Sequence, residues 1–259
     1  MAGYYGTELQ QHLQRRADEL AAEIGPTPGL CSAGRMVSTD DVDLVGLDYC
    51  ASVVEADGGF VFKFIPSDRT EEISRFLAAR GLRVDWWDTF TGSAADCREP
   101  SARISAGGPP AGFRQVEPTA ESLEGVRAFL AEQGIAAFSR STLAGETVRG
   151  RCFTLVDERG TLAATAFTYL PHNASSRFQG YGWVGLVAVA PAHRGRALGT
   201  YINACAVTAA FTQLGATHVY EQVSSTNTPS RRMVESSGLT LHPVMKAGLA
   251  VRGTEKFTR

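Results

Sequence analysis

The sequence predicts an α/β protein with two units joined by a linker. Segments with strand patterns alternate with segments of helical period along most of the 259 residues. Glycine, proline and serine gather in residues 91–112, which carry no apolar period. We therefore expect a smaller α/β unit at 1–95, a linker at 96–112 and a larger α/β unit at 113–259.

The elements expected in the N-terminal unit follow from their apolar spacing. A helix is expected over 7–24 and a weaker one over 41–55. Residues 60–65, Phe-Val-Phe-Lys-Phe-Ile, read as a strand. A helix over 68–80 and an alternating strand over 82–90 complete this unit.

In the second unit, the pattern alternates again from residue 113. The helix expected over 197–214 contains no charged residue. A helix with a solvent-facing side normally carries charges there. We expect this helix to be covered by the sheet and by either the N-terminal unit or a second copy of the chain, so a homodimer is one option. The expected strands are 113–116, 151–156, 162–170, 181–190, 218–223 and one or two within 239–251; the other helices are 119–133, 136–147 and 227–237.

The stretch from Val184 to Gly199 carries the main functional signal. A short apolar run, typical of a buried strand, ends at Pro191. The basic, glycine-containing turn from Arg194 then opens a helix. Free backbone N–H groups and the positive end of the helix dipole favour an anion such as pyrophosphate. The alternative is an ordinary helix start with two exposed arginines.

Two motifs at a fixed separation carry a family resemblance. The first is Val189-Ala-Pro191 followed by Arg194-Gly-Arg-Ala-Leu-Gly199, and the second consists of Asn227, Ser230, Met233 and Gly238. With the order of elements from residue 113 onward, they make this part of the chain resemble the GNAT superfamily of acyl-CoA-dependent N-acyltransferases. The resemblance implies the GNAT fold, a mixed central sheet flanked by helices, and makes the N-terminal unit a candidate for a degenerate tandem half.

The resemblance also implies an acyl-CoA co-substrate, in the first place acetyl-CoA, at the opening of this helix. Backbone groups of the strand would pair with the pantetheine arm, and the turn would hold the pyrophosphate. Asn227 would contact the pantetheine, or cap the last helix, or both. Ser230 would approach the cofactor or be a small packing residue. The residues implied are Val187, Ala188, Val189, Arg194, Gly195, Arg196, Ala197, Leu198, Gly199, Thr200, Asn227 and Ser230.

Three positions depart from the family pattern. Ala197 replaces the middle glycine of the turn and is expected to fit a helical conformation. Val234 stands where many members carry a tyrosine that protonates the leaving thiolate. Trp183 stands near where some relatives carry an acidic residue. Neither common catalytic position is therefore ionisable.

The candidate catalytic residues come from neighbouring strands. Glu221 is our first candidate for the general base, because burial of a carboxylate is costly and raises its pKa. Its alternative role is an ion pair or hydrogen bond in the core. Tyr181 and Tyr220 are weaker candidates for the proton donor, since most such tyrosines are packing residues. His172 lies in a polar loop before the central strand, where histidine is more often without a special role.

Composition limits the other function classes. The net charge of −2 and the pI near 6.2 give no general support for binding to nucleic acid or a membrane. The sequence contains no run of 18 apolar residues, so no membrane-spanning helix is expected. Five scattered cysteines without a CxxC pair argue against a metal site and favour reduced thiols in the cytoplasm.

From these observations we expect an N-acetyltransferase that acts directly on the amine of a small molecule. The alternatives are a GNAT-fold enzyme with another acyl donor or chemistry, and a non-catalytic CoA-binding regulatory protein. No second CoA site is expected in the N-terminal unit, because it lacks the basic glycine turn.

Overall fold

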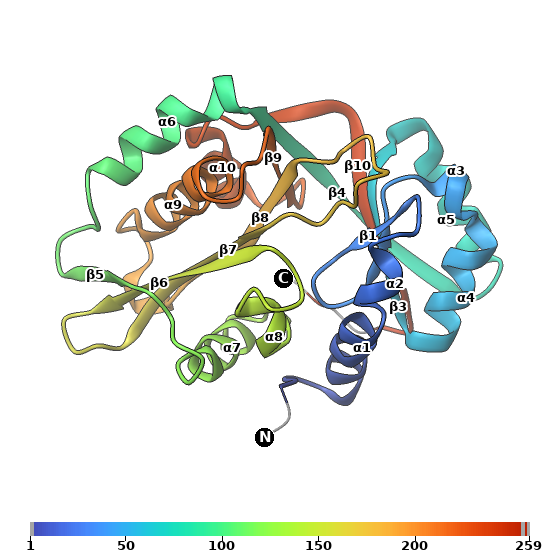
Figure 1. The fold of residues 1–259 in the computed structure, drawn as a ribbon, viewed down its shortest axis with the longest axis horizontal. Coiled ribbons are helices and arrows are strands. Elements are labelled where there is room, and N and C mark those ends of the chain that lie inside the picture. Colours follow the sequence, from blue (N-terminus) through green and yellow to red (C-terminus); the bar gives the residue numbers. More distant parts are fainter. Residues whose placement is uncertain (1–2, 255–256, 258–259) are drawn as a thin grey trace.

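A computed structural model describes residues 3–254 and residue 257, and within them the chain forms one sheet of ten strands (Figure 1). The strands are β1 Leu30–Ser32, β2 Val37–Thr39, β3 Gly59–Pro66, β4 Leu82–Ser93, β5 Phe113–Val116, β6 Gly150–Asp157, β7 Leu162–Tyr169, β8 Tyr181–Val189, β9 His218–Val223 and β10 Thr240–Arg252. Their order across the sheet is β1-β2-β3-β10-β4-β9-β8-β7-β6-β5.

The helices cover both faces of this sheet (Figure 1). They are α1 Glu8–Glu19, α2 Ala21–Ile24, α3 Val42–Val45, α4 Leu47–Asp57, α5 Thr70–Ala78, α6 Ala94–Ala106, α7 Leu123–Glu132, α8 Arg140–Leu143, α9 Leu198–Thr212 and α10 Thr228–Ser236, with 3₁₀ turns η1 Ser67–Arg69 and η2 Pro191–His193. Helices α6, α9 and α10 share one core with β6–β9, while α7 and α8 pack on the opposite face of β6–β8. Helices α3–α5 pack around β3 at the other end.

Most predicted elements of the second unit are confirmed. The β6–β7 hairpin is antiparallel, and its turn is fixed by Asp157, whose Oδ1 accepts hydrogen bonds from the backbone N–H groups of Arg159 and Thr161 at 2.9 and 2.8 Å. The predicted helix over 136–147 is wrong in extent, because only Arg140–Leu143 is helical. Ser139 begins that helix by accepting from the N–H of Thr142. Residues 135–138 before it are neither helix nor strand, and the N–H of Ala136 is bonded to Phe257 O.

The segment expected to be a linker, 96–112, is largely helical, because residues 94–106 form helix α6. Ser93 and Asp96 form a capping box that starts this helix, and Cys97 and Ser101 are its buried residues. Helix α6 packs along the uncharged helix α9. The cover expected for α9 thus comes from within this chain, from the segment that we expected to be a linker.

The two expected units contribute strands to one sheet, and β10 of the second unit lies among the strands of the first. Strand β10, the last strand described, is antiparallel to both β3 and β4 and lies between them. Strand β4 in turn pairs with β9 of the second unit. How far 1–95 and 113–259 behave as separate units stays a prediction, but their secondary structure forms one continuous sheet.

Two strands carry matching irregularities. In β8, the two residues Leu186 and Val187 face the single residue Ala166 of β7, and Leu186 has a positive φ of 51°. In β3, Phe64 has a φ of 53° where the register to β10 also shifts. Each is a β-bulge, which turns the side chains that follow it toward the other face of the sheet. Accordingly Val184 packs on the α9 face, whereas Leu186 and Ala188 pack on the α7 face.

Candidate active site

Strands β8 and β9 part in the middle of the sheet and leave a cavity. They pair only over Tyr181–Trp183 and His218–Tyr220. Beyond Trp183 their backbones separate, and the β8 bulge lies directly after this point. The cavity that begins there has a volume of about 880 Å³. Backbone groups of β8 that no longer face β9 are therefore available to a ligand on this side of the strand.

The turn after β8 forms one end of the cavity. Pro191 opens η2, and the chain enters α9 with no side-chain cap at its N-terminus, so the first backbone N–H groups of the helix lack an intrahelical partner. The expectation for Ala197 is wrong: its φ of 60° and ψ of 10° are left-handed, not helical. A glycine would adopt this conformation without the clash that the Ala197 methyl group makes.

The two arginines of this turn behave differently. Arg194 donates from Nη2 to Gln133 Oε1 at 3.1 Å and lines the cavity. Arg196 donates to Ala111 O at 3.1 Å, packs on the ring of Phe113, and does not line the cavity. All the residues expected to bind the cofactor, apart from Arg196, line this one cavity: Val187, Ala188, Val189, Arg194, Gly195, Ala197, Leu198, Gly199, Thr200, Asn227 and Ser230. Their role toward a cofactor stays a prediction.

The second motif positions α10 against the turn. Asn227 Oδ1 accepts from the backbone N–H of Ser230 at 3.2 Å and so caps α10. A Cβ on Gly199 would lie 3.5 Å from Val189 Cγ2 and 3.6 Å from Met233 Sδ, which is ordinary van der Waals contact, so packing against α10 does not by itself require a glycine there. Gly238 has a φ of 89°, and a Cβ there would lie 2.5 Å from Asp96 O of α6. Of these two glycines, Gly238 is therefore the one that packing requires, because the chain there passes close to the backbone of α6.

Of the three candidate catalytic residues, only Glu221 lines the cavity. Its side chain is on the α9 face of the sheet, where Oε1 accepts from Asn203 Nδ2 at 2.9 Å. Burial raises the pKa of Glu221 to about 8, and the hydrogen bond from Asn203 opposes this in part. The carboxyl group is therefore mostly protonated at neutral pH and ionises at mildly alkaline pH.

The tyrosine candidates lie apart from Glu221. Tyr220 points to the opposite face of β9, and its hydroxyl oxygen is 3.0 Å from Lys63 Nζ. Burial raises the pKa of Tyr220 well above its usual value. The ring of Tyr181 stacks on His218 with 4.4 Å between centroids. Neither tyrosine lines the cavity, so the structure does not bring the three candidates together.

The positions that depart from the family pattern have packing roles. Val234 is fully buried beneath α9. Trp183 lines the cavity, with its ring 5.7 Å from Phe138 and 5.4 Å from Tyr169.

Sequence reasoning missed the residues that the first unit contributes to the cavity. Lys63 of β3 is 1% exposed, and burial lowers the pKa of its amine to about 8. A lysine within an apolar strand is unusual, so the sequence Phe-Val-Phe-Lys-Phe held a signal for it. Arg35 lies in the short connection between β1 and β2, and nothing in the neighbouring sequence predicted that it would line the cavity. The contributed residues are Ala33, Arg35, Val61, Lys63, Trp87 and, from β10, Leu249.

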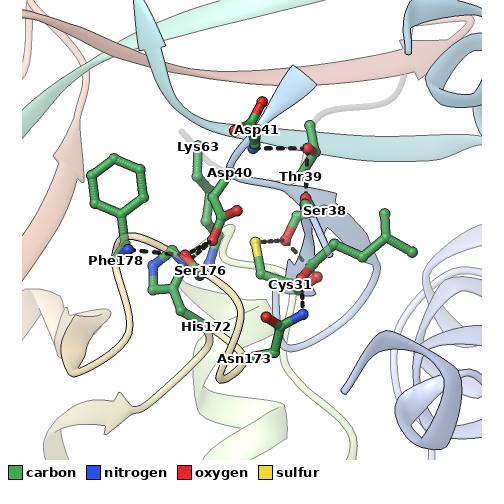
Figure 2. Close-up of polar contacts among 12 residues, drawn as sticks. Cys31, Ser38, Thr39, Asp40, Asp41, Lys63, His172, Asn173, Ser176 and Phe178 are labelled. Carbon is green, nitrogen blue, oxygen red and sulfur yellow. Dashed lines mark hydrogen bonds and ion pairs between the residues drawn. The ribbon is translucent and has the colours of Figure 1, made fainter. Parts of the chain in front are cut away.

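A buried polar cluster supports this side of the cavity. Figure 2 shows Asp40 with His172 and Ser176, next to Cys31 and Ser38. Asp40 is hydrogen-bonded to His172 Nδ1 and accepts from Ser176 Oγ at 2.6 Å. Burial lowers the pKa of His172 to about 4, so the ring is neutral at physiological pH.

This cluster ties the loop after β7 to β1 and β2. Asn173 adds hydrogen bonds from Nδ2 to the backbone carbonyls of Ile24, Thr27 and Leu30 in the first unit. Cys31, Asp40 and His172 offer ligand-type atoms within 4.8 Å of one another. Hydrogen bonds hold Cys31, Asp40 and His172 Nδ1 in place, whereas His172 Nε2 is buried without a hydrogen-bond partner among the described residues. His172 borders a smaller pocket of about 220 Å³ rather than the main cavity.

The sequence of the second unit matches a known family. Residues 124–239 match the sequence model of the Acetyltransferase (GNAT) family. These residues are a GNAT domain. They contain β6–β9, α9, α10 and the turn after β8, so the main cavity is largely bounded by this domain. Among curated proteins, none matches the chain in sequence.

Solved structures share the fold over most of the chain. A GCN5-related N-acetyltransferase from Kribbella flavida superposes with a TM-score of 0.55 at 19% identity, covering 88% of this chain and 79% of that protein. A Drosophila protein gives 0.58 at 15% identity, with 97% and 92% covered. A tandem GNAT protein from the clavulanic acid biosynthesis pathway gives 0.56 at 16% identity, with 93% and 89% covered.

These similarities confirm the predicted fold class, a mixed α/β sheet flanked by helices. At this level of identity they speak for the fold alone. The match of residues 124–239 to the GNAT family indicates acyl transfer in general. Within residues 3–254 and 257, none of the helices has the length and apolar character needed to span a membrane.

Proposed function

We propose that this protein is an acetyl-CoA-dependent N-acetyltransferase that transfers the acetyl group directly to the amine of a small molecule. The observation that carries the proposal is the parting of β8 and β9 next to a bulge, with a basic helix N-terminus at the other end of the same cavity. An extended thioester fits between unpaired strand backbone and free helix N–H groups.

Acetyl-CoA, when bound, supplies the activated acyl group. The N–H groups of α9 and the side chain of Arg194 would hold its pyrophosphate. Backbone groups of Val187 and Val189 would pair with the pantetheine arm, and Asn227 borders the same path. A strand N–H near Val187 is our candidate for polarising the acyl carbonyl.

The acceptor must lose a proton as its nitrogen forms the new C–N bond and the C–S bond breaks. Glu221 is the candidate that takes this proton, because it is the only acid in the cavity lining. Tyr181 and Tyr220 would have to move to reach the leaving sulfur. An enzyme with no proton donor beside the leaving sulfur can still release CoA, because water can protonate the thiolate.

A turnover assay tests this proposal. The protein is mixed with acetyl-CoA and a panel of primary amines, and free CoA thiol and acetylated amine are both measured. We expect equal amounts of the two products for at least one amine. Turnover only with a different acyl-CoA would support the alternative donor, and tight acetyl-CoA binding without any turnover would support a regulatory role.

The remaining properties follow as proposals of the same kind. A small-molecule amine is the expected partner, with no nucleic acid or membrane contact, and the protein acts in the cytoplasm. Helix α6 covers α9 within one chain, so the uncharged helix gives no reason of its own for a homodimer.

A further inference from the structure

The cavity wall that comes from the first unit carries a guanidinium, that of Arg35, with no acidic partner within residues 3–254 and 257. Arg35 Nη1 donates to Ala136 O at 2.8 Å, and its guanidinium carbon lies 5.4 Å from the ring centre of Phe138 and 5.9 Å from that of Phe257. Arg35 Nε is buried without a hydrogen-bond partner among the described residues. No carboxylate in that part of the chain forms an ion pair with Arg35.

A second cation lies on the same wall. Lys63 Nζ donates to Ser32 O at 2.8 Å and to the hydroxyl oxygens of Tyr220 and Tyr169 at 3.0 and 3.4 Å. These partners are all neutral. Asp40 affects Lys63 only through space, because its hydrogen bonds go to His172 and Ser176. The residues that line the cavity therefore provide no ion-pair partner for Lys63, and Asp40, outside the lining, balances its charge only in part.

Among the described residues that line the cavity, none carries a fixed negative charge that would balance these cations at neutral pH. Glu221 is the only acid in its lining, and burial keeps this carboxyl group mostly protonated. An acceptor with cationic groups alone would be repelled by Arg35 and Lys63. An acceptor that also carries an anion would be attracted, and a planar guanidinium suits a carboxylate because it can donate two parallel hydrogen bonds.

The rest of this wall is apolar and favours an acceptor that carries an apolar or aromatic group beside its charged groups. The apolar lining residues here are Val61, Trp87, Phe138, Trp183 and Leu249.

We propose that the acceptor is a small amine that carries a carboxylate, such as an amino acid with an apolar or aromatic side chain, and that Arg35 binds this carboxylate. The inference rests on the proposed acetyltransferase function. Lys63 adds positive potential, which also favours the neutral, nucleophilic form of the acceptor amine.

Matched pairs of acceptors test this inference. Phenylalanine is compared with phenethylamine, and leucine with 3-methylbutylamine, by the kcat/KM for CoA release. We expect the amino acid of at least one pair to be preferred by about 10- to 100-fold, the range of a charged bidentate contact. Arg35→Met should remove this preference, and Arg35→Lys should keep part of it. Arg103→Met, on a 72% exposed arginine of α6, is the matched control and should leave the preference intact.

A binding measurement separates this inference from the proposed function. N-acetylphenylalanine and N-acetylphenethylamine are titrated onto the CoA-bound protein by calorimetry, which needs no turnover. Tighter binding of the carboxylate, lost in Arg35→Met but kept in Arg103→Met, supports the inference even if no amine is acetylated. Acetylation of both members of each pair at equal rates, or equal binding of the two amides, would overturn it and leave the proposed function standing. Circular dichroism of Arg35→Met and Arg35→Lys identifies any loss due to misfolding.

Discussion

Replacing Glu221 by glutamine should stabilise the protein at alkaline pH and slow its reaction. Glutamine has nearly the shape of the protonated carboxyl group and can still accept the hydrogen bond from Asn203. In the folded protein the pKa of Glu221 is raised from 4.5 to about 8. The folded state therefore keeps a proton that the unfolded chain releases, and this favours unfolding increasingly as the pH rises from 4.5 to about 8.

The size of the effect follows from the proton difference. Over that interval the folded carboxyl group holds up to one more proton than the unfolded one. The free energy of unfolding of the wild-type protein should then fall by up to about 1.4 kcal/mol per pH unit relative to Glu221→Gln. Other titrating groups, including Lys63 and His172, are common to both proteins and cancel in the difference.

Urea denaturation of the two proteins at pH 5, 6, 7 and 8 measures this difference. If the difference in unfolding free energy is the same at every pH, the carboxyl group titrates normally and our account of its burial is refuted. The same samples test its chemistry. A general base contributes about 10²- to 10⁴-fold, so kcat should fall by that order and the rise of rate toward pH 8 should disappear. An unchanged rate profile would assign Glu221 to the hydrogen-bond network with Asn203 alone.

Three further predictions concern the turn and the glycines around the cavity. Gly238→Ala should lower the unfolding free energy by about 2–4 kcal/mol, because its Cβ would collide with a backbone oxygen of α6. Gly215→Ala, at φ 72° with open space around it, should lower the unfolding free energy by only about 1 kcal/mol. Equal losses for the two variants in urea denaturation would contradict the steric argument. Ala197→Gly should raise the unfolding free energy by up to about 1 kcal/mol, because it relieves a left-handed alanine, and a lower thermal midpoint would speak against this. Arg194→Met should raise the Kd for acetyl-CoA about 10-fold in calorimetry, while Arg196→Met, which points away from the cavity, should change it little; similar losses in both would mean that the turn acts only through its net charge.

The sequence was most informative where function depends on neighbours along the chain. The strand, turn and helix from Val184 to Gly199 are local, so their residue types predict a buried strand and an anion-binding helix start. Ala197 shows the limit of this approach. Its side chain permits a helical conformation, but the turn requires a left-handed residue at that position.

The helix in the segment expected to be a linker was missed because its residue types are common both in loops and at the start of helices. Ser93 and Asp96 read as loop residues, yet they form a capping box. Pro100 reads as a break, yet it lies within α6, where it removes only the hydrogen bond to the carbonyl of Asp96. That helix was needed to cover α9, and tertiary packing decided its conformation.

The acceptor side could not be predicted, because it is assembled across the chain. Arg35 and Lys63 reach the cavity only because β10 and β4 join the two units in one sheet. No spacing within the sequence records this meeting. The buried lysine of β3 was the one local sign, and its partners Tyr169 and Tyr220 lie more than 100 positions away.

The position of β10 has a consequence for biosynthesis. A ribosome releases β3 and β4 long before it releases the strand that separates and pairs with both of them. Until residues 240–252 emerge, two apolar strands of the N-terminal segment lack the neighbour that joins them. The early part of the chain must therefore remain incompletely folded during synthesis, and the last strand closes the molecule. A nascent chain stalled before residue 240 should be cleaved readily by protease, whereas one extended beyond residue 252 on a spacer should resist it.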